Sequence, residues 1–181
     1  MSYYFAYGSN MLEERLKHRV TSAAFRTIVA LPGYRLRFRK KSEDCSGKCD
    51  IFHTRCPDDI VHGVIFDIDD SQLPDLDHIE GCGSGYHRDT ITLHLADGAQ
   101  TNAWVYFADT DAIDEALVPY SWYYELVIRG AEQHRLPNDY IAGLRAVPFT
   151  ADPKPDRKTK REAEEALASY YSNRKKNGLT P

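Results

Sequence analysis

One acidic side chain occupies a position where proton-transfer chemistry is plausible. Glu80 is expected at the C-terminal end of a short helix, where Gly81 provides the stop. The helix itself is predicted by the helical spacing of Leu73, Leu76 and Ile79. A glutamate buried in such a place can accept and donate a proton near neutral pH. An exposed glutamate at a helix end would have the same local sequence, so this residue alone leaves both interpretations open.

The second candidate is a turn near the start of the chain. Residues 3–7 are aromatic and short, which is typical of a buried strand, and Gly8 and Ser9 end that strand. Asn10 is expected to cap the helix that follows, with Glu13 as its capping-box partner. Such a junction presents unpaired backbone N–H groups, which suit a carboxylate or an oxyanion. Many turns of this composition bind nothing, so a purely structural role also stays open.

Phenol groups form the third set of candidates, since the chain has 12 tyrosines. A tyrosine on a strand or helix can line a pocket or belong to the core, and the sequence does not separate the two for Tyr106, Tyr120, Tyr123 and Tyr124. The 7 histidines lack a metalloprotease spacing, and no serine lies in a nucleophile elbow. These patterns disfavour a dedicated metal site and a serine triad.

The 4 cysteines have uneven spacing and are expected to be free thiols. The alternative is a zinc site formed by Cys45, Cys49, His53 and Cys56, whose ligand chemistry is acceptable. This stretch lacks the short pairs of cysteines that zinc knuckles use. No metal is therefore expected.

Composition and charge indicate a single soluble domain. The chain has 181 residues, with 23 Lys+Arg against 27 Asp+Glu, a net charge of −4 and a pI near 6.0. There is no overall basic field to attract nucleic acid. No apolar stretch approaches the roughly 20 residues of a membrane-spanning helix, and the first residues do not form a secretory signal. These features predict a cytoplasmic protein without nucleic-acid or membrane partners.

Helical and strand patterns mix without regular alternation, which predicts an α+β domain built around an antiparallel sheet or small barrel. The expected strands are 3–7, 28–38, 50–52, 60–68, 90–95 and 103–107, and the expected helices follow Asn10 and cover 73–80, 120–133, 139–147 and 162–171. The composition becomes charged after Pro148. We therefore expect a domain over residues 1–150 and a charged tail or surface helix over 151–181.

Two short motifs, in the right order and spacing, carry a resemblance to a known family. Residues 4–10 read Y-F-A-Y-G-S-N, and residues 76–81 read L-D-H-I-E-G. Together they resemble the γ-glutamylcyclotransferase family over residues 3–148. The resemblance implies a small, mainly antiparallel β-barrel with flanking helices, in an intracellular, cofactor-free enzyme that is often a homodimer. Such an enzyme acts on a small γ-glutamyl compound, releases an amine or amino acid and leaves 5-oxoproline.

The resemblance also assigns roles by position. Glu80 takes the part of the general acid and base. The residues implied in binding the γ-glutamyl substrate are Tyr4, Phe5, Ala6, Tyr7, Gly8, Ser9, Asn10, Tyr106 and Tyr123. Tyr86 and Arg88 form a Y-x-R arrangement that looks more like the branch acting on γ-glutamyl amines and acylated antibiotics than the branch acting on dipeptides.

Two other functions remain open at this point. One is the removal of a γ-glutamyl protecting group from a biosynthetic intermediate. The other is a non-catalytic module that binds a small molecule on the same scaffold, because a fold does not by itself fix a function.

Overall fold

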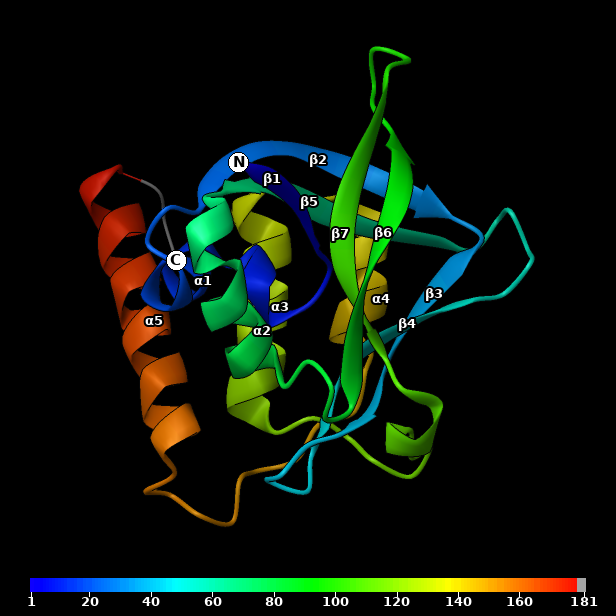
Figure 1. The fold of residues 1–181 in the computed structure, drawn as a ribbon. Helices are drawn as coiled ribbons and strands as arrows, with labels where there is room; N and C mark the ends of the chain where they lie inside the picture. The colour runs from blue at the N-terminus through cyan, green and yellow to red at the C-terminus, as the bar shows by residue number, and fades with distance from the viewer. Residues whose placement is uncertain (179–181) are drawn as a thin grey trace.

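The structure, a computed structural model, describes residues 1–178 of the chain, and seven strands form two sheets in it. The larger sheet has the order β2-β5-β1-β7-β6, and β3 pairs with β4 in the smaller one (Figure 1). The strands are β1 (Ser2–Ala6), β2 (Ala24–Pro32), β3 (Tyr34–Lys41), β4 (Gly47–His53), β5 (Ile60–Ile68), β6 (Tyr86–His94) and β7 (Gln100–Ala108).

Strand β1 lies at the centre of the larger sheet. It runs antiparallel to β5 along its whole length and parallel to β7, where Tyr4 is opposite Trp104. The other pairings are antiparallel, so the predicted α+β class with a mainly antiparallel sheet is confirmed. The described strands form two separate sheets and do not close into one continuous barrel.

Helix α3 is central among the helices and is buried on most of its surface, as expected of a helix covered on several sides. It packs against the short turn of 3-10 helix η1 (Ser9–Met11) and against α4 and α5. The α-helices are α1 (Glu13–Arg19), α2 (Leu73–Glu80), α3 (Ser121–Gln133), α4 (Asn138–Arg145) and α5 (Lys158–Lys176). Across residues 1–178, no helix is both long and apolar enough to cross a membrane.

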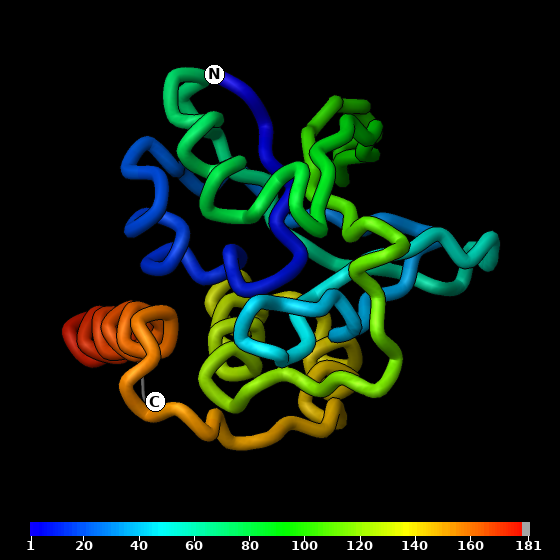
Figure 2. The backbone as a smooth tube through the Cα atoms, turned by 60° about the horizontal axis from the view of Figure 1, so that its bottom comes forward, coloured from blue at the N-terminus to red at the C-terminus, as the bar shows by residue number. Residues whose placement is uncertain are grey.

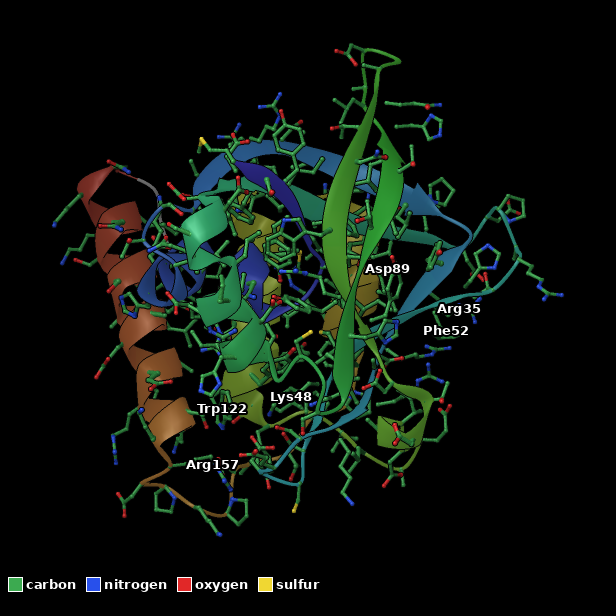
Figure 3. The ribbon with its side chains drawn as sticks, viewed as in Figure 1. Arg35, Lys48, Phe52, Asp89, Trp122 and Arg157 are labelled. Atoms are coloured by element: carbon green, nitrogen blue, oxygen red, sulfur yellow. The ribbon has the colours of Figure 1, made fainter. Side chains whose placement is uncertain are left out.

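The charged C-terminal segment forms a docked helix. Figure 2 shows α5 nearly end-on beside the rest of the chain, and α5 packs against α1 and α3 through buried Ala163, Ala166, Leu167 and Tyr170. The connection before it is anchored at Asp152, which accepts hydrogen bonds from Trp122 Nε1 at 3.0 Å and Arg157 Nε at 2.8 Å. Figure 3 shows Trp122 and Arg157 near the beginning of α5. Burial opposes ionisation of Asp152, but these bonds prevail and lower its pKa to about 2.

Candidate active site

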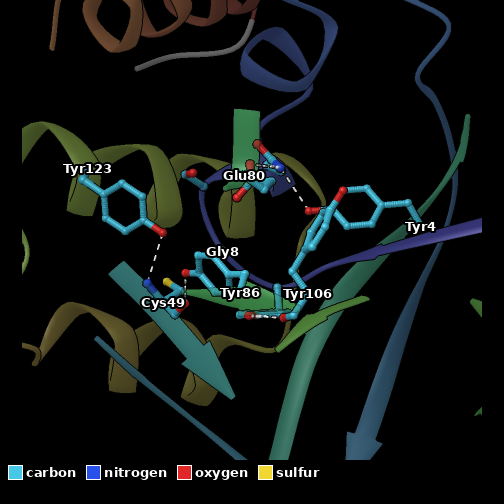
Figure 4. A pocket seen from close by; sticks show the side chains of 10 residues that line it. Tyr4, Gly8, Cys49, Glu80, Tyr86, Tyr106 and Tyr123 are labelled. Atoms are coloured by element: carbon cyan, nitrogen blue, oxygen red, sulfur yellow. Dashed lines mark hydrogen bonds between the residues drawn. The ribbon is translucent and has the colours of Figure 1, made fainter. Parts of the chain in front are cut away.

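A small pocket, partly open to solvent, lies where the first turn, both sheets, α2 and α3 meet (Figure 4). Its walls come from segments far apart in the sequence. The lining residues are Tyr4, Tyr7, Gly8, Ser9, Asn10, Cys49, Glu80, Tyr86, Tyr106 and Tyr123. Glu80 is the one acidic side chain among them.

Glu80 is the last residue of α2, and Gly81 ends the helix with a left-handed φ of 70°, as the sequence predicts. Its carboxylate Oε1 accepts a hydrogen bond from Asn10 Nδ2 at 2.9 Å and forms an ion pair with Arg19. The side chains of Glu80 and Arg19 are each 18% exposed. The carboxylate is therefore held in a fixed position and remains exposed to the pocket.

Asn10 does not cap a helix as the sequence suggested. It lies inside η1, its side chain makes no capping bond, and α1 begins only at Glu13. The side-chain Nδ2 of Asn10 donates to Tyr4 OH at 3.0 Å as well as to Glu80, and its Oδ1 accepts from Arg19 at 2.9 Å. The side-chain amide of Asn10 therefore bonds to Tyr4, Glu80 and Arg19, and it does not bond to a backbone N–H group at the start of α1.

Tyrosine hydroxyl groups fix the opposite wall of the pocket. Tyr86 OH donates to the backbone carbonyl of Cys49 at 2.5 Å, and the Cys49 N–H donates to Tyr123 OH at 3.1 Å. Tyr7 OH donates to the carbonyl of Tyr106 at 2.6 Å. These bonds link β4, β6, β7 and α3 around one cavity, which gives the pocket a rigid shape.

Burial keeps the other titratable groups of the pocket neutral. It raises the pKa of the Cys49 thiol and of all five lining phenols, those of Tyr4, Tyr7, Tyr86, Tyr106 and Tyr123. These groups can donate or accept hydrogen bonds, but near neutral pH they cannot serve as bases. Proton exchange with a bound molecule is therefore left to the carboxylate of Glu80.

The turn between β1 and α1 supplies backbone donors. The first hydrogen bond of η1 runs from Met11 N–H to the Gly8 carbonyl at 2.9 Å, so the N–H groups of Ser9 and Asn10 have no acceptor within the helix. A β-carbon on Gly8 would lie 3.0 Å from Cβ of Cys49 and 3.4 Å from Tyr123 OH. Glycine at this position lets the turn approach the opposite wall closely.

Most of the residues predicted from the sequence meet in this pocket, including Tyr86, and three do not. Phe5 and Ala6 are fully covered in the core and do not line the pocket. Neighbouring residues of a strand point to opposite sides, and Phe5 packs against Gly63, away from Tyr4. Arg88 lies outside the lining and pairs with Asp77 Oδ2 at 2.9 Å. Asp77 also accepts from Tyr106 OH at 2.8 Å, so Arg88 reaches the pocket only indirectly.

Two residues of the site were missed at the level of sequence. Arg19 pairs with Glu80, and Cys49 lines the pocket, whereas the spacing of the cysteines indicates only a free thiol or a zinc ligand at Cys49. The spacing of Arg15 and Arg19 on one helix face was an available signal, because residues four apart lie on the same side of a helix. Within residues 1–178, no three His, Cys, Asp or Glu side chains cluster in a way that could hold a metal ion.

The connecting role of Asn10 is directly testable with the isosteric change Asn10→Asp. The new carboxylate cannot donate to Tyr4 or Glu80, and it places a second negative charge 2.9 Å from the Glu80 oxygen. We expect catalytic efficiency to fall about 10- to 100-fold, as for the loss of a hydrogen bond to a charged group. Steady-state kinetics measure this, and an unchanged efficiency in a folded variant would show that Asn10 does not position Glu80.

Comparison with known proteins places the chain among relatives of similar architecture. The family described as "Gamma-glutamyl cyclotransferase, AIG2-like" matches residues 4–125. A protein from Homo sapiens named "Gamma-glutamylcyclotransferase" is 32% identical over 150 residues, which cover 80% of this chain and 77% of that protein. The protein of the same name from Bos taurus is 33% identical over the same length. A solved structure described as "Gamma-glutamyl cyclotransferase" has a TM-score of 0.78 and 27% identity, covering 91% of this chain and 98% of that one.

Proposed function

The chain belongs to the AIG2-like gamma-glutamyl cyclotransferase family, and on this premise we propose that it is a γ-glutamylcyclotransferase that releases 5-oxoproline from a γ-glutamyl amide. Family membership agrees with the resemblance predicted from the two motifs. In the proposed reaction the α-amine of the substrate attacks the γ-carbonyl of the same molecule. Such a reaction needs no nucleophile from the protein.

The observation that carries the proposal is the isolation of one carboxylate among neutral groups. Glu80 is held by Asn10 and Arg19 at the edge of a small pocket whose other titratable groups stay protonated. A cyclisation of this kind requires one group that first takes a proton and then returns it. The pocket contains one side chain suited to that task.

The proposed reaction passes through one tetrahedral intermediate, and Glu80 carries the proton between the two nitrogen atoms. Glu80 takes a proton from the substrate α-ammonium, and the freed amine nitrogen forms a bond to the γ-carbonyl carbon, which closes a five-membered ring. The carbonyl oxygen then carries the negative charge. The ring nitrogen at this stage carries a positive charge and one surplus proton. When the tetrahedral intermediate collapses, the bond from this carbon to the departing nitrogen breaks, and Glu80 returns its proton to that nitrogen. The surplus proton of the ring nitrogen then passes by way of the Glu80 carboxylate to the released amine. The products are 5-oxoproline and a free amine.

The first turn contributes binding and orientation. The N–H groups of Ser9 and Asn10, which have no acceptor in η1, are suited to hold the substrate carboxylate or the developing oxyanion. The tyrosine-lined walls would hold the γ-glutamyl chain bent, so that its amine lies close to its own carbonyl. Holding reacting groups together in this way accounts for a large share of the rate of intramolecular reactions.

A panel of γ-glutamyl amino acids and γ-glutamyl amines tests the proposal. We expect 5-oxoproline and the free amine to appear in equal amounts, as measured by mass spectrometry after incubation with purified protein. A preparation carrying a substitution at Glu80 is the control for a contaminating enzyme. If no panel compound yields 5-oxoproline, the proposed reaction is wrong for this chain.

The two alternative functions have less support. The removal of a protecting group would use the same chemistry on a larger acylated substrate, and adding such a compound to the panel tests it. A binding module has no need of a fixed, partly exposed carboxylate, and a cavity filled by side chains would suit it better than the open pocket seen here.

Family membership also underlies two further proposals, that the protein is a homodimer and that it acts in the cytoplasm. Size-exclusion chromatography with light scattering tests the first. A mass near 20.7 kDa at micromolar concentration would identify a monomer and contradict it.

A further inference from the structure

Asp77 is a second acidic residue on the helix of Glu80, and the proposed reaction does not use it. It precedes Glu80 by three residues in α2, so the two side chains lie on the same side of the helix. Its Oδ1 accepts a hydrogen bond from Tyr106 OH at 2.8 Å, and its Oδ2 accepts one from Arg88 Nη1 at 2.9 Å. One oxygen of this carboxylate thus contacts a pocket residue, and the other contacts a cation outside the pocket.

The bond to Asp77 fixes the direction in which the Tyr106 hydroxyl group can act. A phenol has one proton, and an ionised carboxylate has none, so the proton of this bond belongs to Tyr106. Toward the pocket, which Tyr106 lines, the phenol oxygen can therefore only accept a hydrogen bond. The negative charge of Asp77 behind the O–H bond makes that oxygen a stronger acceptor.

Tyr4, the neighbour of Tyr106 in the pocket wall, has the opposite polarity. The two ring centroids are 5.9 Å apart, and Figure 4 shows the two side chains beside each other. Tyr4 OH accepts a hydrogen bond from Asn10 Nδ2 at 3.0 Å, which leaves its own proton available to the pocket. Asn10 also donates to Glu80, so this wall adjoins the Glu80 carboxylate. A ligand beside Glu80 therefore meets one phenol that donates and one that accepts.

Arg88 holds Asp77 in place from the outer side. Its guanidinium lies 5.7 Å from the centroid of the Trp104 ring, and Trp104 stacks on Tyr4 with centroids 4.5 Å apart. Arg88 is thus fixed between a carboxylate and an aromatic ring of the same wall. The arginine of the Y-x-R arrangement acts on the pocket through Asp77 and does not enter it.

We propose that Asp77 is a positioning residue that holds Tyr106 as the hydrogen-bond acceptor for the α-ammonium group of the substrate. The inference rests on the proposed cyclotransferase function. In that function the α-ammonium must lie beside Glu80, and its N–H groups require acceptors. Tyr106 accepts from one N–H while Glu80 removes the proton of another. The nitrogen is then held with its lone pair free to attack the γ-carbonyl carbon.

The experiment compares γ-glutamylalanine with glutarylalanine, which lacks only the α-amine and is measured as a competitive inhibitor. In Asp77→Asn, Arg88 can bond only to the amide oxygen, so the amide nitrogen faces Tyr106 and donates to it. The phenol proton then turns toward the pocket and opposes the ammonium. We expect kcat/KM for γ-glutamylalanine to fall about 10- to 100-fold, the range for one hydrogen bond to a charged group. The inhibition constant of glutarylalanine should keep its native value.

Two double variants separate this effect from a structural defect. Adding Arg88→Met to Asp77→Asn frees the amide to turn its oxygen back to Tyr106, so part of the lost activity should return. Adding Asp77→Asn to Tyr106→Phe should cause little further loss, because the phenol on which Asp77 acts is already absent. Asp75→Asn, at an exposed position in the first turn of the same helix, makes the same change of charge and should retain native kinetics.

The outcomes distinguish this inference from the proposed function. If Asp77→Asn weakens the binding of both compounds equally, or if Arg88→Met deepens the loss, Asp77 does not set the polarity of Tyr106. If another panel compound is the better substrate, that compound and its glutaryl analogue replace the alanine pair. If the native chain forms 5-oxoproline from no panel compound, the proposed reaction fails and the assignment of Asp77 fails with it. Thermal unfolding of each variant shows that the compared proteins are folded.

Discussion

Glu80→Gln is expected to reduce the rate of 5-oxoproline formation by about 10²- to 10⁴-fold, the range for loss of a general acid and base. Glutamine has nearly the same shape and can still accept the hydrogen bonds from Asn10 and Arg19. It cannot take a proton from the substrate ammonium or return one to the departing amine. The measurement is kcat at saturating substrate, followed as 5-oxoproline by mass spectrometry.

A matched control for Glu80→Gln exists on the same helix. Asp75 lies in the first turn of α2, is exposed and does not line the pocket. Asp75→Asn changes the net charge of the protein by the same amount and should retain native activity. Both variants should keep the native circular dichroism spectrum. A Glu80→Gln protein that kept most of its rate would remove Glu80 from the reaction.

The position of Glu80 could be predicted because it depends on local rules. The apolar spacing of α2 and the glycine that ends it lie within nine residues, and both act through backbone geometry that any chain shares. Strand β5 was predicted at its observed limits for a similar reason, since a short segment rich in apolar and β-branched residues is a local signal.

The partners of Glu80 could not be predicted in the same way. Asn10 and Arg19 are 70 and 61 residues away from it in the chain, so their contacts depend on how α1 and α2 pack. At the level of sequence, Asn10 satisfied a local capping rule, and the long-range contacts with Tyr4 and Glu80 override that rule.

Which side of β6 faces the pocket also could not be predicted from sequence. A shift of one residue in a strand exchanges its two faces, so sequence alone cannot decide whether Tyr86 or His87 faces inward. The pairing of β6 with β7, with Tyr86 opposite Ala108, places Tyr86 in the pocket and leaves His87 exposed beside Asp109. The same pairing cannot be inferred from residues within β6 alone.

Gly130→Ala is expected to destabilise the protein, although alanine is the better helix former. In an open helix the change would stabilise by roughly 1 kcal/mol. In α3, a β-carbon on Gly130 would lie 2.6 Å from the backbone nitrogen of Leu12 and 2.7 Å from Cβ of Met11. These atoms cannot rotate away, so we expect a net loss of about 1–3 kcal/mol, as for overpacking in a core. The measurement is the thermal midpoint, which should fall by about 2–4 °C for each kcal/mol.

Gly143→Ala provides the opposite result as a control, because Gly143 lies in α4 with no atom within 4 Å of the added β-carbon. It should raise the thermal midpoint slightly and leave activity unchanged. Gly130→Ala should lower activity even in its folded form, because Met11 belongs to η1, which also holds Asn10 beside Glu80. If both substitutions stabilise the protein equally, a methyl group at Gly130 does not clash with Met11 and Leu12, and the close packing of α3 against η1 does not position the site.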